Sequence, residues 1–404
     1  MIRKVSRHGV GYSVVDLEGV SHVFAAAVPR EGSRLEEEAR DALRTIEAVF
    51  REEGDRDSIV AQTVFLRDPA ELEACRSILK DFYGRAMPAT TYVAQPPCEG
   101  RLLSLEALGI GKGEDAVVIE RVDERTVVAR HGGVSWIHVA HATPSTSDPR
   151  LYARTLSAFR EVAERLRSLG VGFDRVVRSW LYLGDIVGLE DGLQRYHELN
   201  RARTDFYRGV DFARALGLRS PGDRAYPAST GIGTGGRDVV VSSIAVSAEP
   251  GRIAFLPLEN PLQTSACDYA GRYGRESPKF SRAMAVVGSS SVTIFVSGTA
   301  SITGSETRWF GDVERQTHQT LDNIEELVSE ANFARHGRPG IGAKLGDLAL
   351  ARVYLKRPED YGRARAVCEA RLGELPTAYA VADVCRPDLL VEIEGIAFAK
   401  APGG

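Results

Sequence analysis

The chain has 404 residues, of which 43% are hydrophobic and 26% charged, the composition of an ordinary globular protein with two or three domains. Its 51 Lys and Arg against 55 Asp and Glu give a formal net charge of -4, which excludes a chain-wide basic surface for nucleic acid. No apolar run approaches the roughly 20 residues that cross a bilayer, and the first residues lack the apolar core of a secretory signal, so we expect no membrane partner.

The cysteines indicate the compartment. There are five, scattered along the chain without any C-x-x-C pair: Cys75, Cys98, Cys267, Cys368 and Cys385. A disulfide framework or a zinc ribbon needs paired and regularly spaced cysteines. We therefore expect a cytoplasmic protein whose thiols are reduced.

One order of elements occurs three times: a helix, a strand, a second helix and a closing strand. In the first copy, the helix at 33–53 has apolar residues at three- and four-residue steps, which is typical of one buried helix face. These residues are Leu35, Ala39, Leu43, Ile46 and Phe50. A strand at 59–66, a helix at 70–82 and a closing strand at 102–108 complete this copy.

The second copy begins near Trp136. Asp148 followed by Pro149 predicts the start of its first helix, with an acidic N-cap and proline at the first helical position. The predicted buried stripe of this helix is Leu156, Phe159, Val162 and Leu166. The elements that follow are a strand at 176–183, a helix through Tyr196 and Arg203, and a closing strand at 238–246.

The third copy begins with a strand at 292–296. A helix at 312–330 follows, and its predicted buried residues are Val313, Leu321, Ile324 and Val328. A strand at 348–355, a helix at 358–372 and a closing strand at 389–399 complete the copy. Phe65-Leu66, Tyr182-Leu183 and Tyr354-Leu355 occupy equivalent places in the three copies.

Each copy predicts an α+β module in which two helices cover one face of a mixed sheet. Three such modules can bury their open faces together, so we expect a single-chain pseudo-trimer that works as a monomer. The expected domains are 1–125, 126–255 and 256–404, with irregular inserts at 204–226 and 247–291. Three unrelated α+β domains in series are the alternative.

Three local motifs have ordinary explanations. The run Gly231-Ile232-Gly233-Thr234-Gly235-Gly236 is followed by strand residues rather than a helix, so we expect a tight loop in a pocket wall instead of a dinucleotide site. His138 and His141 would point to opposite faces of a strand, which favours ordinary polar roles over metal binding. The small residues of Ser297-Gly298-Thr299-Ala300-Ser301 indicate either close approach of a ligand or a β-bulge.

The closing strand of the third copy carries the main chemical signal. Alternation places Glu392 and Glu394 on one sheet face, with Val391 and Ile393 on the other. Two carboxylates in an apolar strand are costly unless they are solvated or paired. The equivalent strand of the first copy has one acid and that of the second has none, so we expect one of three clefts to hold the pair. A solvated edge strand is the alternative.

The chain resembles the Rid (reactive intermediate deaminase) superfamily, whose small members are homotrimers with sites between subunits. The resemblance is carried by Gln316-Thr317-x-x-Thr320-Leu321-Asp322-Asn323-Ile324 and by Val391-Glu392-Ile393-Glu394-Gly395-Ile396-Ala397. The deaminases also place an arginine in the strand before the last motif. Here that stretch, 376–380, has none, which disfavours imine hydrolysis.

A narrower resemblance, over about residues 130–400, is to the chorismatases, cofactor-free enzymes that remove pyruvate from chorismate. It is carried by the phrases Arg178-Ser179-Trp180-Leu181-Tyr182, Gly192-Leu193-Gln194-Arg195-Tyr196-x-x-x-Asn200-x-x-Arg203, Tyr269-x-x-x-Tyr273-Gly274-x-x-Ser277-Pro278-x-Phe280-Ser281-Arg282-Ala283, Ser297-Gly298-Thr299-Ala300-Ser301 and Asp383-Val384-Cys385-Arg386-Pro387-x-Leu389-Leu390-Val391-Glu392-Ile393-Glu394. The resemblance implies substrate binding by Tyr196 with Arg203 and by Tyr269 with Arg282, and catalysis by Glu392. Gly298 and Cys385 favour the subgroup that forms 3-hydroxybenzoate over the one that forms a dihydroxycyclohexadiene carboxylate.

The chemistry of these residue types agrees with that resemblance. Two arginines can each hold one carboxylate of a small dicarboxylate such as chorismate, and a partly desolvated glutamate can deliver a proton to an enol ether. No metal, flavin or nucleotide is required. Asp268 and Gly271-Arg272 depart from the family pattern. A Rid-type enzyme acting on another carboxylated metabolite and a non-catalytic ligand-binding Rid protein are therefore the alternatives.

Overall fold

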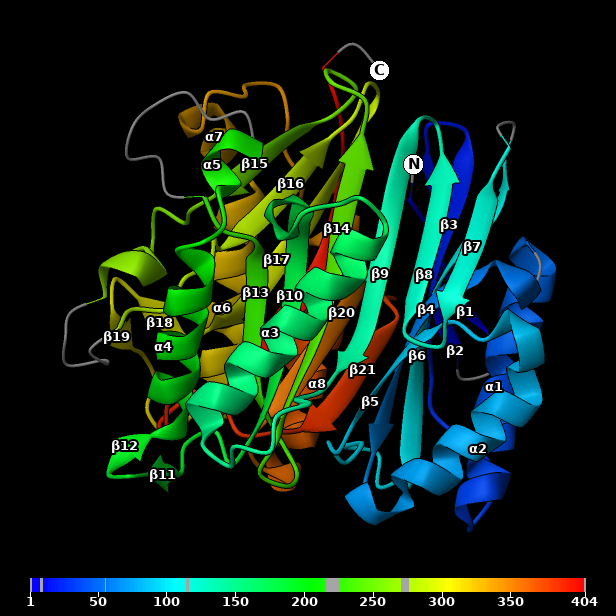
Figure 1. Ribbon diagram of the computed structural model, residues 1–404, viewed down its shortest axis with the longest axis horizontal. Coiled ribbons are helices and arrows are strands. Elements are labelled where there is room, and N and C mark those ends of the chain that lie inside the picture. The colour runs from blue at the N-terminus through cyan, green and yellow to red at the C-terminus, as the bar shows by residue number, and fades with distance from the viewer. Residues whose placement is uncertain are drawn as a thin grey trace.

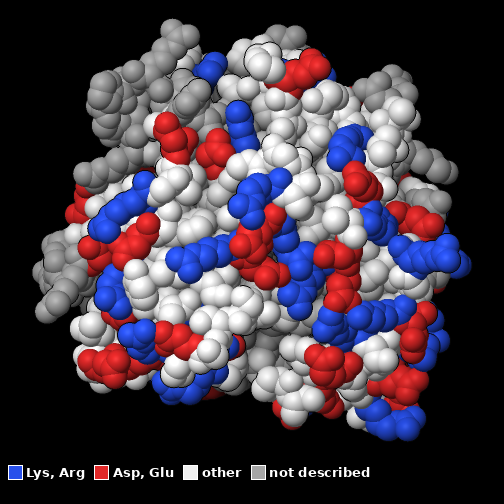
Figure 2. All heavy atoms as spheres, in the orientation of Figure 1, with Lys and Arg blue, Asp and Glu red and all other residues white. Residues whose placement is uncertain are grey.

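The computed structural model describes residues 2–7, 10–54, 56–113, 116–215, 225–269 and 276–402. Within them, three six-stranded sheets form the centre of the molecule and the helices lie outside (Figure 1). No helix in these ranges is long and apolar enough to cross a membrane. On the face shown in Figure 2, basic and acidic side chains are intermixed, as a net charge near zero leads one to expect.

The first module is a sheet covered by two helices. Its strands, in spatial order, are β1 (Ile2–Arg7), β2 (Val10–Leu17), β3 (Val20–Ala27), β6 (Leu103–Gly113), β4 (Ile59–Leu66) and β5 (Ala89–Val93). The helices are α1 (Leu35–Glu53) and α2 (Leu72–Tyr83). All five apolar residues predicted for the first helix are buried in one cluster with strand residues, which confirms its amphipathic period.

The second and third modules repeat this plan. In the second, the strands are β7 (Val118–Asp123), β8 (Thr126–His131), β9 (Val134–Ala142), β14 (Val239–Ala248), β10 (Val176–Gly184) and β13 (Ala228–Thr234), with helices α3 (Leu151–Ser168) and α4 (Arg195–Tyr207). In the third, they are β15 (Ala254–Leu258), β16 (Ala283–Val287), β17 (Ser291–Ala300), β22 (Val391–Lys400), β20 (Leu348–Leu355) and β21 (Thr377–Val381), with helices α6 (Val313–Val328) and α8 (Tyr361–Leu372).

The second and third modules also contain short additional helices and hairpins. They are the hairpin β11 (Leu189–Glu190) and β12 (Leu193–Gln194), helix α5 (Phe212–Ala215), the hairpin β18 (Ile302–Thr303) and β19 (Glu306–Thr307), and helix α7 (Glu330–Arg335). The strand arrangement of the three large sheets is nevertheless the same. In each, the first five strands pair antiparallel and the sixth pairs parallel to the fifth. The repeat is thereby confirmed as an α+β pseudo-trimer.

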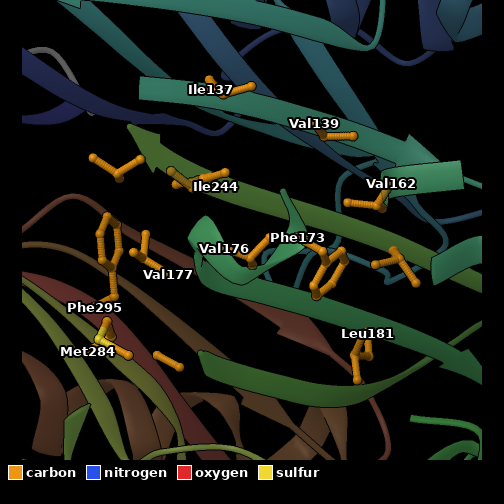
Figure 3. Packing of buried hydrophobic residues seen from close by; sticks show 14 of the residues in the cluster. Ile137, Val139, Val162, Phe173, Val176, Val177, Leu181, Ile244, Met284 and Phe295 are labelled. Atoms are coloured by element: carbon orange, nitrogen blue, oxygen red, sulfur yellow. The ribbon is translucent and has the colours of Figure 1, made fainter. Parts of the chain in front are cut away.

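The open sheet faces meet at the centre of the molecule. One buried cluster contains residues of all three modules. It includes the three residues predicted to be equivalent, Phe65, Tyr182 and Tyr354. A larger core contains residues of all three modules, with Val15, Leu17 and Phe24 from the first. Figure 3 shows Val177 and Ile244 of the second near Met284 and Phe295 of the third. Burial of these apolar faces holds the modules together.

The start of each repeat differs from the prediction. The second module begins with β7 rather than near Trp136, and the third begins with β15 rather than at residue 292. Residues 247–291 are therefore not wholly an irregular insert, because they contain β15 and β16. The change of sheet falls between 113 and 118 and again between 248 and 254, so a boundary at 125 would separate β7 from its partner β8.

The entry to α3 also differs. The N-cap is Arg150, not Asp148. The Asp148 side chain instead accepts a hydrogen bond from the Arg150 backbone N–H at 3.0 Å. The free N–H of Leu151 donates instead to Glu190 Oε1 at 2.7 Å, so a carboxylate from β11 replaces the local cap. Leu156 is only half buried, and Thr155 takes its place in the core face.

Candidate active site

A cavity of about 370 Å³ lies between the second and third modules. It is bounded by α4 and β13 of the second and by β17 and the start of β22 of the third. All seven site residues predicted from the sequence line it: Tyr196, Arg203, Tyr269, Arg282, Gly298, Cys385 and Glu392. They come from both modules, so the fold rather than sequence proximity brings them together.

Helix α4 supplies the first tyrosine–arginine pair. Tyr196 and Arg203 are seven residues apart, which is about two helical turns and puts both on one face. Gly231 of β13 makes room for the tyrosine ring, because a Cβ added at this glycine would lie 2.9 Å from Tyr196 Cε2. The Arg203 guanidinium is buried, and its Nη2 donates to Asn200 Oδ1 on the same helix.

The segment before β16 supplies the second pair. Arg282 is buried, and its Nη2 donates to Tyr269 Oη at 2.6 Å and to the Thr264 carbonyl at 2.9 Å. Its guanidinium carbon lies 5.3 Å from the centre of the Phe280 ring, and that of Arg203 lies 5.9 Å from the same ring. One aromatic side chain therefore lies against both cations.

These two arginines keep donor capacity for an anion. Among the described residues, neither forms a salt bridge, and the Nε atoms of Arg203 and Arg282 are buried without a hydrogen-bond partner. A buried guanidinium with unused donors is costly unless a ligand satisfies it. The cavity is thus suited to a small molecule with carboxylate groups.

Glu392 lies on β22 and lines the cavity. Burial, with help from the nearby negative charge of Glu394, raises the pKa of Glu392 to about 8, although Arg178 and Arg282 oppose the shift. The side chain therefore holds a proton at neutral pH and can donate it to a ligand. Val391 and Ile393 lie in the helix-side core, as the alternation predicted.

Glu394 has a different environment. It accepts hydrogen bonds from Arg178 at 2.6 Å, Trp180 at 2.7 Å and Arg352 at 3.2 Å, and it lines a separate cavity of about 70 Å³ rather than the first. Although burial opposes ionisation, the two arginines lower the pKa of Glu394. The two acids of the strand thus differ in protonation, and Glu392 is the one presented to a ligand.

Gly298 controls how closely β17 approaches that acid. The pairing of β17 with β22 shifts between Val296 and Thr299, so Gly298 is a β-bulge and also lines the cavity. A Cβ at this position would lie 2.1 Å from Glu392 Oε1, which is far inside contact distance. The bulge predicted for this segment is confirmed, whereas close approach of a ligand stays a prediction.

Cys385 lies in the loop before β22, beside the acid. Burial, and then the charge of Glu392, raises the pKa of the Cys385 thiol to about 12. The neutral thiol is a poor nucleophile. Its place in the cavity wall instead makes it a small, polarisable contact for a ligand ring.

In the part of the chain that the structure describes, Glu392, Arg203 and Arg282 come together in this cavity. By strand register, Glu392 opposite Tyr354 corresponds to Ser104 opposite Phe65 in the first module and to Val240 opposite Tyr182 in the second. The single acid of the first module, Glu106, corresponds to Glu394 instead. The strand positions of the first and second modules that correspond to Glu392 therefore carry no carboxyl group.

Several lining residues were not singled out from the sequence. They are Phe280, Arg386, Phe310 and residues of the β18–β19 hairpin. Phe280 and Arg386 stand inside quoted motifs, which is the signal that could have identified them. Phe310 is 71% exposed at its place in the cavity wall and lies in a segment without any motif. The quoted Gly271, Arg272, Tyr273 and Gly274 lie outside the described residues.

The glycine run begins in a strand of the second module, and the two histidines singled out from the sequence lie in another. Gly231 and Gly233 belong to strand β13 rather than to a loop, and the next element is strand β14, so these glycines do not lead into a helix as those of a dinucleotide fingerprint do. His138 lines the cavity of Glu394, and His141 Nδ1 accepts a hydrogen bond from the Tyr92 N–H of the first module at 3.3 Å. The pairing of β9 shifts beside His141, whose φ is 51°, so the alternation that predicted opposite orientations does not hold there. Among the described residues, no three His, Cys, Asp or Glu side chains gather as a metal site would require.

Comparison of the sequence with known proteins identifies similar families and relatives. The family description "Chorismatase FkbO/Hyg5-like, N-terminal" matches residues 114–245, and "Endoribonuclease L-PSP" matches residues 276–399. A 3-hydroxybenzoate synthase of Streptomyces hygroscopicus is 33% identical over 283 residues, covering 66% of this chain and 78% of the relative. A chorismatase of Streptomyces rapamycinicus is 32% identical over 274 residues, covering 66% of this chain and 77% of the relative.

A solved structure extends the likeness to the first module. A chorismatase crystal structure superposes with a TM-score of 0.66 at 24% sequence identity, over 95% of this chain and 100% of the other. The three-module fold is therefore shared beyond the region of closest sequence similarity.

Proposed function

The chain belongs to the chorismatase family, and on that premise we propose that it is an enzyme that removes pyruvate from chorismate. The observation that carries the proposal is Glu392, a carboxyl group that holds a proton at neutral pH inside a cavity with two buried arginines. A ligand-binding protein needs the arginines, but it has no use for a buried proton donor. The proposal therefore favours catalysis over binding alone.

Substrate binding follows from charge. Chorismate has two carboxylates, and we assign one each to Arg203 and Arg282, whose side chains enter the cavity from different modules. A charge-assisted hydrogen bond contributes about 1.5–3 kcal/mol, so the two together fix the substrate's orientation. Tyr196 and Tyr269 add neutral donors beside the cations. Burial raises the pKa of Tyr196, which keeps its hydroxyl protonated.

The proposed reaction begins with proton transfer. Glu392 donates its proton to the methylene carbon of the enolpyruvyl group, which converts the enol ether into an oxocarbenium ion. In the route to 3-hydroxybenzoate, the bond between the ether oxygen and the ring carbon then breaks, and that oxygen leaves as the keto oxygen of pyruvate. The ionised Glu392 is afterwards reprotonated by the exchangeable proton that the attacking hydroxyl group releases, or by solvent.

The product depends on what attacks next. If the neighbouring ring hydroxyl attacks the ring carbon as pyruvate leaves, an epoxide forms and rearranges to 3-hydroxybenzoate, and no water is consumed. If water instead attacks the carbon of the oxocarbenium ion, a hemiketal forms and collapses to pyruvate, and the ether oxygen stays on the ring as a hydroxyl of the dihydroxycyclohexadiene carboxylate. Gly298 and Cys385 leave space beside Glu392 for the ring, so we propose 3-hydroxybenzoate.

The proposal extends to assembly and compartment. The cavity that holds Glu392 is lined by two modules of one chain, so the enzyme is proposed to complete its site without a second copy and to act as a monomer. The five cysteines are free, which suits the reducing cytoplasm. The first module is proposed as a structural domain that closes the pseudo-trimer.

A direct test is pyruvate release from chorismate, followed with a coupled dehydrogenase and compared between wild type and Glu392→Gln. The variant keeps the shape but cannot donate a proton, so turnover should fall by about 10²–10⁴-fold while binding survives. Other enolpyruvyl and keto carboxylates serve as alternative substrates. Turnover of one of these but not of chorismate would favour a Rid-type enzyme on another metabolite, and equal activity of Glu392→Gln would remove the assigned acid.

A further inference from the structure

A buried ionic chain crosses the centre of the molecule and joins all three modules. Arg352 of β20 donates to both carboxylate oxygens of Glu106 on β6, at 2.7 and 2.5 Å. Its Nη1 also donates to Glu394 Oε1 at 3.2 Å, and Arg178 of β10 donates to Glu394 Oε2 at 2.6 Å. The four residues are between 2% and 6% exposed.

The chain is electrically balanced. Two arginines meet two carboxylates, and the first module contributes one of the negative charges through Glu106. All four residues line the cavity of about 70 Å³, where His138 also lies; burial lowers the pKa of that imidazole to about 4 and keeps it neutral. Charges this deeply buried are weakly screened, so removing one leaves an uncompensated charge near Glu392.

Ionisable and charged groups reach Glu392 from several elements. They are Glu394 on its own strand, Arg178 on β10, Arg282 before β16, Tyr196 on α4 and Cys385 in the preceding loop. Glu394 in turn faces Arg178 and Trp180 on β10, Thr230 on β13, and Arg352 and Tyr354 on β20. Arg352 faces Glu106 on β6, Thr63 on β4, Tyr182 on β10 and Tyr354.

Glu106 is thus one step removed from the acid. It engages Arg352 at two atoms, whereas Glu394 engages the same arginine at one, so Arg352 is compensated mainly by the first module. The charge of Glu394 that repels a negative Glu392 is consequently offset chiefly by Arg178. Without Glu106, the full charge of Arg352 would act on Glu394 and Glu392.

We propose that Glu106 of the first module is a positioning residue for the reaction: by neutralising Arg352 it leaves Glu394 able to keep Glu392 protonated. The inference rests on the proposed role of Glu392 as the acid. It assigns the first module an electrostatic part in catalysis, although none of that module's described residues lines the active-site cavity. The groups act in sequence as Glu106, Arg352, Glu394 and Glu392.

The test is the pH profile of the full-length enzyme with chorismate. Because the protonated acid is the active form, kcat should fall on the alkaline side of the profile as Glu392 ionises. Glu106→Gln leaves the positive charge of Arg352 uncompensated, and this charge favours ionisation of Glu392. The alkaline limb of the variant should therefore lie about one pH unit lower than that of wild type. Its kcat on the acidic plateau should stay within about twofold of wild type. Glu36→Gln, on the exposed face of α1, is the matched control and should leave the profile unchanged.

Two further variants separate charge from structure. Glu106→Gln combined with Arg352→Gln removes both charges, so the limb should return to the wild-type position. If Glu106→Gln does not fold, the same substitution is combined with Arg352→Lys. Lysine keeps the positive charge but does not need a carboxylate that binds it through two oxygen atoms. The limb should then move relative to Arg352→Lys alone.

A second readout does not depend on turnover. The titration of the Glu392 carboxyl, followed by carbon NMR in protein labelled at glutamate and assigned by its loss in Glu392→Gln, should shift with the same sign. A folded Glu106→Gln enzyme with an unmoved limb and titration, or with activity lost equally at every pH, would overturn the inference. Absence of chorismate turnover in wild type would instead overturn the proposed function, and the NMR titration would still decide the role of Glu106.

Discussion

Arg282 shows how one side chain connects burial to binding. Its guanidinium is held by Tyr269 and Thr264, so its position is fixed before a ligand arrives. We expect Arg282→Ala to lower kcat/KM, because a substrate carboxylate would be left unpaired in a buried site. The expected loss of transition-state stabilisation, relative to free enzyme and substrate, is about 2–4 kcal/mol. Arg335→Ala, on the surface of α7, is the control. Equal kcat/KM in Arg282→Ala and wild type would exclude the role.

Glu392 should also make stability depend on pH. Its pKa in the folded protein, about 8, is above the ordinary value of 4.5, so the native state binds the proton more tightly than the unfolded state. This contribution to stability is fully present below about pH 4.5 and is lost as pH rises through about 8. Glu392→Gln cannot titrate, so its stability relative to wild type should increase by about 2–4 kcal/mol between pH 5 and pH 8.

Urea unfolding of both proteins at the two pH values measures that difference. Other titrating groups are common to the pair and cancel in the comparison. Parallel stability curves for wild type and Glu392→Gln would mean that Glu392 has an ordinary pKa in the folded protein.

Gly298 provides a test of product choice. A methyl group at this position would overlap Glu392 Oε1 in its present conformation, so the acid or the ring must move. We expect Gly298→Ala to remain active but to shift the product from 3-hydroxybenzoate toward the dihydroxycyclohexadiene carboxylate, by at least about tenfold in their ratio, since about 1.4 kcal/mol is sufficient. Chromatography of the products measures the ratio. The same ratio in both proteins would show that Gly298 serves packing only.

At the scale of single elements, two aspartates near helix starts make a matched pair. Asp312 is the N-cap of α6, and its side chain accepts from the Arg315 N–H at 3.1 Å. Asp148 lies before the cap of α3, where Glu190 satisfies the helix N–H instead. Asp312→Ala should therefore cost about 1 kcal/mol in unfolding free energy and Asp148→Ala less than about 0.5. Denaturant titration checks both values, and a larger loss in Asp148→Ala would reverse the assignment.

The elements that the sequence predicts best are those with a strong local period. Helices α1 and α6 bury the apolar residues that the sequence indicated, because three- and four-residue spacing is a property of the segment itself. Strands β7 and β15 were missed. β7 has mostly exposed and half-buried residues, and β15 contains Pro257, so neither shows the regular alternation of a buried strand.

At the scale of the whole molecule, the recurring order of elements was sufficient to predict the pseudo-trimer. All seven expected site residues line one cavity, whereas their roles stay proposals. The contact of Arg352 with Glu106 could not be predicted, since it joins residues 246 positions apart and depends on how three sheets pack about one centre. Only Glu106 had been noted there, as the single acid of its strand.

The three modules divide the proposed chemistry between them. The second supplies Tyr196 and Arg203, the third supplies Glu392 and Arg282, and the first supplies a charge to the central ionic chain. The cavity between the second and third modules is where the acid meets both buried arginines. The central claim is therefore that a proton from Glu392 initiates the loss of pyruvate.

The most direct measurement is mass spectrometry of both products after turnover of chorismate in D₂O. If Glu392 is the acid, its exchangeable proton will be deuterium, so pyruvate should carry one deuterium in its methyl group and be formed in equal amount with 3-hydroxybenzoate. A rapid enzymatic reduction of the pyruvate limits later exchange. Pyruvate whose methyl group contains only hydrogen would mean that the atom came from the substrate ring, and this result would contradict general acid catalysis by Glu392.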